Sequence, residues 1–512
     1  MVWIRRDAMR VAAVGLPITP SSALRRQLIK VRGIHVRLLQ SSVRMQDSEG
    51  SEMKPKPEPQ AITPAWLRRL LEDDAQPPKL YAWTPKNLGV WAKVRPKSGS
   101  WTGAKGRGGD SDDERRRIYI LGVGNIGCLY AMCLSKMANR PPITLVVHRR
   151  ELLERWAAEP GIELTRYGQV HRNADFDVEW WTEEATPRDG SCGVASEVAG
   201  GRSIGNIIIA TKAADAVPQV DRIRRYLSSG STVAFTQNGM CKLWPPLGDA
   251  YVRARFPDRS SPNWIACVTT HGVTSQGPFK STHASPANAL VGPVMPSRAN
   301  GAAGRMGYLM HQVANAPDLD AHKISRKKLW VAQLEKLVVN AIINPLTAVL
   351  RCKNGELFVA RDDVLPIVID KLLNEASETL CSLIIDSRSD EILLPRSVGQ
   401  EAPAEKPDLV PLGGDREQLL QRFSFLRLRK MVLDVGTIVA ANTSSMLQDV
   451  RAGKPTEIDD FNGRLVDTAM LLNKRLRLPT HEALIALVKS QTTLTRAELC
   501  TRILGEKASV KL

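Results

Sequence analysis

An apolar run that leads into a glycine-rich loop and then a helical stretch limits what this chain can fold into more than any other feature. Arg117–Val123 (RIYILGV) is typical of a buried parallel strand, and CLYAMCLSKMA after the loop favours a helix. Between them lies GxGxxG, whose glycines permit a tight turn, a close approach of the backbone to a pyrophosphate, and close packing of helix on strand. The helix N-terminus adds free N–H groups for the phosphates. We therefore predict that a dinucleotide is bound by Gly122, Val123, Gly124, Asn125, Ile126 and Gly127.

A second apolar run, Ile143–Val147, ends in the basic sequence His148, Arg149 and Arg150. An NAD-binding fold places Asp or Glu here, about 20 residues past the glycines, to bind the ribose 2′-hydroxyl. A basic position suits the 2′-phosphate of NADP instead. The alternative is a solvated charge pair that opens the next helix. We predict that Arg149 and Arg150 select NADPH.

Three further apolar runs continue the strand series: Asn206–Ala210, Thr232–Phe235 and Ile265–Thr270. Lys212, Asn238 and Gly272 follow these runs in turn. Ligands of doubly wound sheets gather beyond the carboxyl ends of the strands, so we predict that these three residues lie near the cofactor. A lysine that starts a helix and an Asn-Gly turn are the structural alternatives for the first two.

The segment Lys327–Leu350 predicts a long helix that is apolar on more than one face and therefore lies inside a domain. Lys336, Asn340 and Asn344 are spaced i, i+4 and i+8, so their polar groups project along one stripe. These groups need partners, which predicts that the stripe faces a wet cleft or a polar ligand. Pro345 removes a backbone donor and is expected to kink or end the helix. A snorkelling lysine with two structural amides is the alternative.

The pattern is helical from about Ala321 onward, and further polar groups follow the long helix. Asn354 lies just beyond it, in the sequence KNGEL. Ser445 and Gln448 form the S-x-x-Q pattern of a capping box, so capping is the structural alternative for this serine. Glu457 lies in a first helical turn, where a carboxylate favours the helix dipole whatever its function.

Residues 1–62 precede any firm element. From Met1 to Arg44 there are nine Lys or Arg residues and one acid, Asp7, a composition typical of a mitochondrial transit peptide. A basic tail on a cytoplasmic protein is the alternative. Residues 46–62 predict a polar, proline-rich linker. In the extension over residues 63–115, Pro64–Asp74 is expected to form a short amphipathic helix.

Composition limits the partners. The net charge of +18 raises nucleic acid as a partner, but no basic run interleaved with aromatics indicates such a surface. No apolar run reaches the length of a transmembrane helix. The eight cysteines form no CxxC pair and the eight histidines no cluster, so we predict a reduced compartment and no bound metal.

From about Arg117 to Leu504 the chain resembles the ketopantoate reductase (2-dehydropantoate 2-reductase) family, in its fungal style with a long N-terminal extension. The motifs that carry the resemblance occur in the family's order: GVGNIG, ATKA, TQNGM, KLVVNAIINPLTA, KNGEL and NTSSMLQDVRAGKPTEIDDFNG. The resemblance implies an α/β fold, with a Rossmann NADP-binding domain at 116–320 followed by an all-helical, 6-phosphogluconate-dehydrogenase-like domain at 321–512. The chain departs from the family in its extension and in insertions near 183–203, 240–263 and 387–415.

The resemblance also implies roles for individual residues. Lys336 would be the general acid, and substrate would be bound by Asn340, Asn344, Asn354 and Ser445. Lys212, Asn238 and Glu457 would complete the cofactor and closure contacts. The implied reaction is NADPH-dependent reduction of ketopantoate to pantoate, by a monomer or homodimer. Two alternatives stay open: an NADP-dependent reductase of another branched 2-keto acid, and a non-catalytic mitochondrial nucleic-acid or assembly factor.

Overall fold

The computed structural model describes residues 63–89, 111–185, 193–257, 260–297, 303–361, 363–394, 412–472 and 475–505. The predicted targeting segment and linker at 1–62 lie outside these ranges, as does the middle of the insertion predicted at 387–415. Among the described residues, no helix has both the length and the apolar character that a bilayer crossing requires. The same residues hold no His, Cys, Asp or Glu cluster suited to a metal ion.

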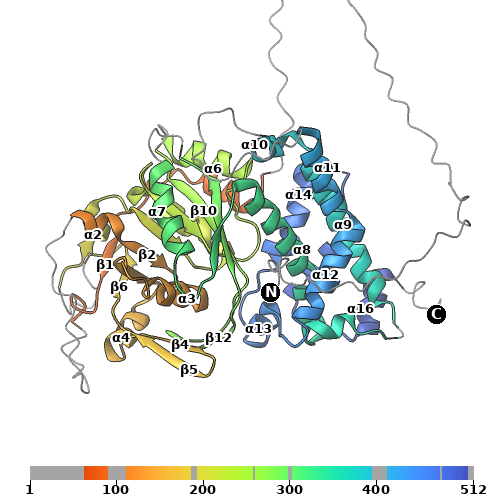
Figure 1. Cartoon of the computed structure of the whole chain (residues 1–512), viewed down its shortest axis with the longest axis horizontal. Coiled ribbons are helices and arrows are strands. Elements are labelled where there is room, and N and C mark those ends of the chain that lie inside the picture. Colours follow the sequence, from red (N-terminus) through yellow and green to blue (C-terminus); the bar gives the residue numbers. More distant parts are fainter. Residues whose placement is uncertain are drawn as a thin grey trace, which may run out of the picture. The chain divides into compact units, whose positions relative to one another are not determined.

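A ten-stranded sheet forms the centre of the α/β part (Figure 1). Its six central strands are parallel, in the order β6-β3-β2-β8-β9-β10. Numbered along the chain, these strands have the order 3-2-1-4-5-6 of a dinucleotide-binding sheet. Most of their residues are buried, which is why the sequence reads as continuous apolar runs. Their bounds are β2 Ile118–Leu121, β3 Ile143–Val147, β6 Asp177–Thr182, β8 Asn206–Ile209, β9 Thr232–Phe235 and β10 Asn263–Thr269.

Side chains alternate between the two faces of the sheet. Tyr119 and Leu121 point into one core, and Ile118 and Ile120 into the other. The first core also contains Leu337 of the long helix, so the sheet and the helical part of the chain share it. The helices that accompany the strands are α3 Asn125–Leu134, α4 Arg150–Ala158, α5 Ala213–Arg222, α6 Leu247–Arg255 and α7 Ala303–Ala314.

Shorter strands complete the α/β part. At one edge of the large sheet, β13 (Ala289–Met295) pairs antiparallel with β10, and β14 (Ala321–Lys323) pairs parallel with β13. The predicted helical pattern from Ala321 is therefore wrong for these three residues, because they complete a sheet edge. A separate four-stranded sheet has the order β11-β12-β4-β5, with β11 Gly272–Gly277, β12 Lys280–Ser285, β4 Ile162–Arg166 and β5 Gln169–Asn173.

The N-terminal extension (residues 63–115) contributes a strand to the ten-stranded sheet. Its helix α1 (Ala65–Glu72) has the amphipathic character predicted, and it packs on α6. Strand β1 (Tyr81–Trp83) pairs antiparallel with β6, and β7 (Ser196–Glu197) pairs with β1. The insertion predicted near 183–203 therefore contains a short strand that extends the sheet.

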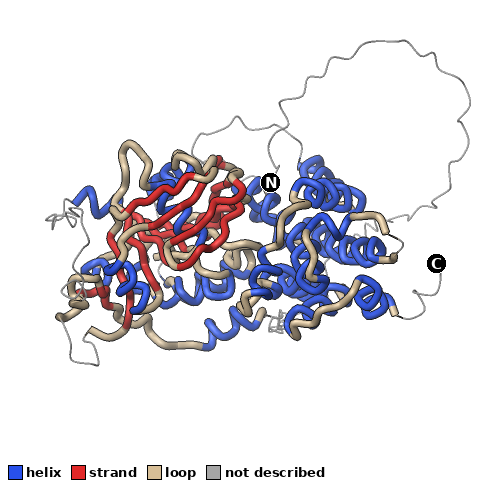
Figure 2. The backbone as a smooth tube through the Cα atoms, turned by 90° about the horizontal axis from the view of Figure 1, so that it is seen from below, coloured by secondary structure: helices blue, strands red, loops and turns tan. Residues whose placement is uncertain are grey.

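The rest of the chain is helical (Figure 2), which confirms the predicted fold class of an α/β part followed by a helical domain. Helix α8 (Arg326–Leu350) continues past Pro345, and its apolar side chains are buried on several sides. The other helical elements of this part include η5 Asn354–Phe358, α9 Leu365–Ile385, α10 Asp390–Leu393, α11 Leu412–Arg422, α12 Phe425–Ile438, α13 Ser445–Arg451, the π-helical turn η7 Asp459–Gly463, α14 Arg464–Leu472, α15 Pro479–Lys489 and α16 Arg496–Leu504.

Candidate active site

The glycine loop between β2 and α3 has the shape that a pyrophosphate requires. Gly122 has φ +100°, and a Cβ there would lie 2.8 Å from the carbonyl carbon of Ala210, the residue that follows neighbouring β8. A Cβ on Gly127 would lie 2.0 Å from the Gly122 oxygen, so the start of α3 packs directly on the turn. A Cβ on Gly124 would meet nothing within 4 Å, which leaves open space at the helix N-terminus. These residues fit a dinucleotide.

Asn125 uses its side chain within the protein. Its Nδ2 donates to the Val273 carbonyl over 3.3 Å, and its Oδ1 accepts from Ser281 Oγ over 3.2 Å. Both partners lie in the small sheet, so the backbone of Asn125 is the part left to meet a phosphate. Gly272 begins the same small sheet, where a Cβ would lie 2.9 Å from that of Ser285. Close packing therefore explains a glycine at this position without reference to a cofactor.

The two arginines after β3 differ in their surroundings. Arg149 is the exposed residue that precedes the first turn of α4. Arg150 is half-buried, and its Nε donates to Glu154 Oε1 over 2.8 Å. Because β3 is the neighbour of β2 in the sheet, both arginines follow a strand end adjacent to the glycine loop. Their selection of NADPH stays a prediction.

Lys336 joins α8 to the carboxyl ends of two strands. Its Nζ donates to Asn238 Oδ1 over 2.9 Å and to the Thr269 carbonyl over 2.6 Å. Asn238 follows β9, and Thr269 is the last residue of β10. Burial lowers the pKa of Lys336 to about 8, and the nearby Glu457 carboxylate opposes that shift. The lysine is therefore held by partners from the sheet and does not snorkel to solvent.

Glu457, Lys212 and Asp449 are further charged residues close to Asn238 or to one another. Asn238 Nδ2 donates to Oε2 of the buried Glu457 over 3.5 Å. The side-chain amide of Asn238 therefore bridges Glu457 and Lys336. Burial raises the pKa of Glu457, while Lys212 opposes the shift. Lys212 pairs with Asp449 over 2.9 Å; burial lowers the pKa of this lysine, but Glu457 and Asp449 outweigh that effect and the pKa is raised.

The predicted substrate-binding amides lie on or near α8. Asn340 is half-buried and Asn344 is 8% exposed, one and two turns beyond Lys336. Asn354 is buried, and its Oδ1 has no hydrogen-bond partner within the described residues. A buried carbonyl oxygen without a donor marks a place where a ligand N–H or O–H could be accepted. The substrate-binding roles of these three residues stay predictions.

The capping interpretation of Ser445 is wrong by one residue. Ser444 is the cap of α13, and its Oγ accepts from Leu447 N over 3.1 Å. The Oγ of Ser444 also lies 2.7 Å from Thr347 Oγ1 on α8. This contact with α8 accounts for the burial of Ser444 and not of Ser445. Ser445 is exposed in the first helical turn, and its role in substrate binding stays a prediction.

Two threonines at the carboxyl ends of strands were missed, and one of them contacts Lys336. Thr269 supplies the carbonyl oxygen that accepts from Lys336, and its own buried hydroxyl has no partner within the described residues. The Thr211 hydroxyl, beyond β8, shares this property. The rule that pointed to Lys212 and Asn238, polar residues at the carboxyl ends of strands, applies equally to both threonines.

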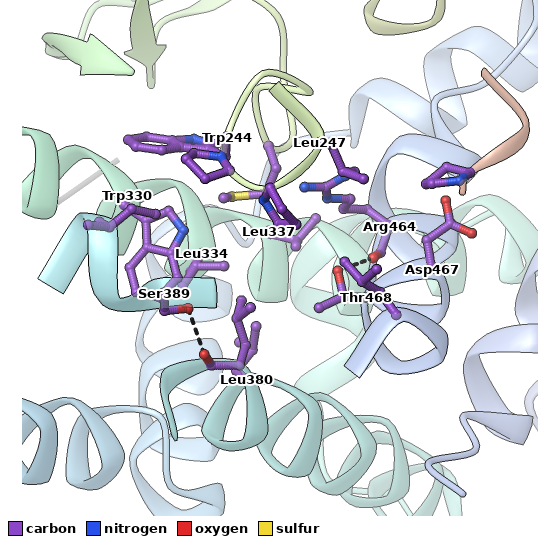
Figure 3. Close-up of a pocket in the computed structure, with 17 residues that line it drawn as sticks. Trp244, Leu247, Trp330, Leu334, Leu337, Leu380, Ser389, Arg464, Asp467 and Thr468 are labelled. Carbon is purple, nitrogen blue, oxygen red and sulfur yellow. Dashed lines mark hydrogen bonds between the residues drawn. The ribbon is translucent and has the colours of Figure 1, made fainter. Parts of the chain in front are cut away.

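A pocket beside α8 is lined by a different set of residues (Figure 3). Trp330, Leu334 and Leu337 line it from α8, and Trp244 and Arg464 line it from other elements. None of the predicted site residues lines this pocket. We therefore place the chemistry at Lys336.

Comparison with known proteins agrees with this arrangement. Residues 118–296 match the family model described as ketopantoate reductase PanE/ApbA, and residues 328–492 match the model for the C-terminal part of the same family. The two matched segments hold Lys336, the glycine loop and Glu457. The chain belongs to the ketopantoate reductase family, which is a family of oxidoreductases.

Individual relatives differ in their names. Ketoisovalerate reductase BEA2 of Gibberella fujikuroi is 41% identical over 448 residues, which cover 85% of this chain and 98% of that protein. A probable 2-dehydropantoate 2-reductase of Schizosaccharomyces pombe is 28% identical over 400 residues, which cover 75% and 99%. A solved structure from Ralstonia solanacearum, assigned to the ketopantoate reductases, has a TM-score of 0.50 at 18% identity, covers 73% of this chain and 97% of that chain, and shares the fold.

Proposed function

We propose that this protein reduces a branched 2-keto acid to the 2-hydroxy acid with NADPH, and that it prefers 2-ketoisovalerate to ketopantoate. The observation that carries the reaction is the Lys336 ammonium, held by Asn238 and Thr269 at the carboxyl ends of the strands beside the glycine loop. The preference is supported by the relatives, since the 41% identical one is named a ketoisovalerate reductase and the 28% identical one a probable 2-dehydropantoate 2-reductase.

Lys336 has the properties of a proton donor. An ammonium carries three N–H donors, and the two contacts to Asn238 and Thr269 leave one for a substrate oxygen. Bound NADPH would supply the hydride to the keto carbon. Lys336 then gives its proton to the oxygen on which negative charge develops. A pKa of about 8 suits this task, because a general acid works best when its pKa is near the working pH.

The other residues of the site would position and desolvate the reactants. The glycine loop and the N-terminus of α3 would hold the cofactor's pyrophosphate, and Arg149 its 2′-phosphate. Asn340, Asn344 and Asn354 offer amide groups for the polar atoms of the substrate. Glu457 raises the pKa of Lys336 and so helps to keep the lysine protonated before transfer.

Ketopantoate is the second candidate. It carries a hydroxyl that 2-ketoisovalerate lacks, and the partnerless Asn354 Oδ1 could accept from such a group. A site built around a substrate hydroxyl rejects the analogue without it by a factor on the order of 10⁴ or more. A site that merely tolerates the hydroxyl discriminates by about 10²-fold or less. The two candidate substrates therefore predict very different ratios of kcat/KM for ketopantoate and 2-ketoisovalerate.

The test is NADPH oxidation by purified protein lacking residues 1–62, with 2-ketoisovalerate, ketopantoate and unbranched pyruvate as substrates. We expect the highest kcat/KM with 2-ketoisovalerate and the lowest with pyruvate. A kcat/KM for ketopantoate above that for 2-ketoisovalerate would overturn the preference and leave the reaction class intact. No turnover of any 2-keto acid would favour the non-catalytic alternative.

A further inference from the structure

Helix α8 contains a proline that should leave a backbone carbonyl without a donor. Pro345 has no N–H, so the carbonyl of Ala341, four residues earlier, cannot form the usual helical hydrogen bond. Ala341 is fully buried, which keeps water from supplying the donor. A buried carbonyl without a partner would be costly. The helix nevertheless runs on to Leu350.

A side chain from another element supplies the missing donor. Asn462, in the π-helical turn η7, donates from Nδ2 to the Ala341 carbonyl over 3.0 Å. The same amide nitrogen lies 2.9 Å from His481 Nδ1. Both partners accept, so the amide can face them only with its nitrogen. Its Oδ1 is buried without a partner within the described residues, which shows that the two N–H groups determine its orientation.

His481 fixes the far side of this amide. Its Nε2 is 3.0 Å from the Leu372 carbonyl, which can only accept, so Nε2 carries the hydrogen and Nδ1 is free to accept from Asn462. Burial lowers the pKa of His481 to about 4, which keeps the ring neutral. Glu375 accepts from the backbone N–H of His481 over 3.2 Å and ties the start of α15 to α9.

This hydrogen-bond network lies next to residues of the candidate active site. Ala341 follows Asn340 directly, and Asn344 precedes Pro345, so the repaired carbonyl lies in the turn between the two amides. On the other side, η7 begins two residues after Glu457. The hydrogen bond from Asn462 thus connects the segment of Glu457 to the segment of the two amides.

We propose that Asn462, oriented by His481, is a positioning residue that replaces the donor missing at Pro345 and so sets Asn340 and Asn344 against Lys336 and Glu457. The expected change in KM rests on the proposed function. The expected change in Tm rests on the hydrogen bonds alone. Asn462 does not touch substrate in this role and acts through α8.

A double-mutant cycle with Pro345 tests the idea. Pro345→Ala restores the N–H at position 345, so the Ala341 carbonyl no longer depends on Asn462. In the wild-type background we expect Asn462→Ala to lower the Tm by about 4 °C or more. We also expect it to raise KM for the 2-keto acid at least about fivefold, with a smaller change in kcat. In the Pro345→Ala background both effects should shrink to less than half. Asn374→Ala, which removes an exposed helical amide bonded to Glu378, is the matched control and should change neither quantity.

The outcomes separate this inference from the proposed function. Equal effects of Asn462→Ala in the two backgrounds would overturn the link to Pro345. A folded Asn462→Ala protein with unchanged KM would overturn the positioning role. If Asn462→Ala alone does not fold, a folded double variant supports the inference and an unfolded one contradicts it. If wild type reduces no 2-keto acid, the proposed function fails, and the Tm cycle decides the inference by itself.

Discussion

Lys336 Nζ lies 2.9 Å from Asn238 Oδ1, a hydrogen bond between residues 98 positions apart that joins the middle of α8 to the loop after β9. Asn238 also contacts Glu457, so one amide connects the ammonium of Lys336 on α8 with a carboxylate that lies just before η7. The ammonium is thereby held where the strands of the dinucleotide-binding sheet end. This relationship is the basis for the first two predictions.

Lys336→Ala is expected to lower kcat by about 10²–10⁴-fold, because the ammonium acts on charge that appears on the way to the transition state. NADPH binding, measured by fluorescence titration, should stay near wild type. Lys328→Ala, at an exposed position of the same helix, is the control. Near-normal kcat in a folded Lys336→Ala protein would contradict the role of this lysine as the proton donor.

The rate should depend on pH through Lys336. Its protonated form is the donor, so kcat is full below the pKa of about 8 and falls as the pH rises through that value. Glu457 raises this pKa, so Glu457→Gln should move the alkaline limb of the kcat profile to lower pH. Glu378→Gln, on α9, should leave the profile in place. An alkaline limb that does not respond to Glu457→Gln would exclude this electrostatic coupling.

Asn340→Ala and Asn344→Ala should each raise KM by about tenfold with smaller effects on kcat, because these amides would bind the ground state as well as the transition state. Steady-state kinetics with the preferred 2-keto acid measures both constants. Asn315→Ala, an exposed asparagine at the end of α7, is the control. Unchanged KM in both variants would show that the stripe on α8 does not contact substrate.

Replacing both Arg149 and Arg150 by Ala should weaken NADPH binding at least about tenfold and leave NADH binding nearly unchanged, because the charges would act on the 2′-phosphate. Of the single variants, Arg149→Ala should have the larger effect, since Arg150 already pairs with Glu154. Arg155→Ala, in the last turn of α4, is the control. Equal losses of NADPH and NADH binding would show that the two arginines do not contact the 2′-phosphate.

We propose that residues 1–45 direct the protein into mitochondria, on the basis of nine Lys or Arg residues up to Arg44 against the single acid Asp7. A fluorescent reporter fused behind this segment should enter mitochondria, and a reporter behind residues 46–62 should not. Microscopy and fractionation of the two reporters measure this difference. A cytosolic reporter in both cases would leave the segment as a basic tail.

Local patterns in the sequence determined much of the fold. Ile143–Val147 and Thr232–Phe235 were predicted as strands with the bounds that β3 and β9 have. The long helix around Lys336 was predicted to within one residue at its start. These features depend on the spacing of apolar side chains along a few turns or pleats, which the sequence displays directly. The same spacing placed Lys336, Asn340 and Asn344 on one stripe.

The partners of those groups were decided by the tertiary structure alone. Asn238 and Thr269 can both contact Lys336 because β10 lies beside β9 in the sheet. Strands β1 and β7 join the sheet by pairing with segments that are distant in the sequence. By local sequence alone, Ser444 and Ser445 are equally suitable as the N-cap of α13. In the structure Ser444 is the cap, and it also contacts Thr347 on α8. Hydrogen bonds between distant segments depend on how the elements cross, and side-chain periodicity carries no information about that crossing.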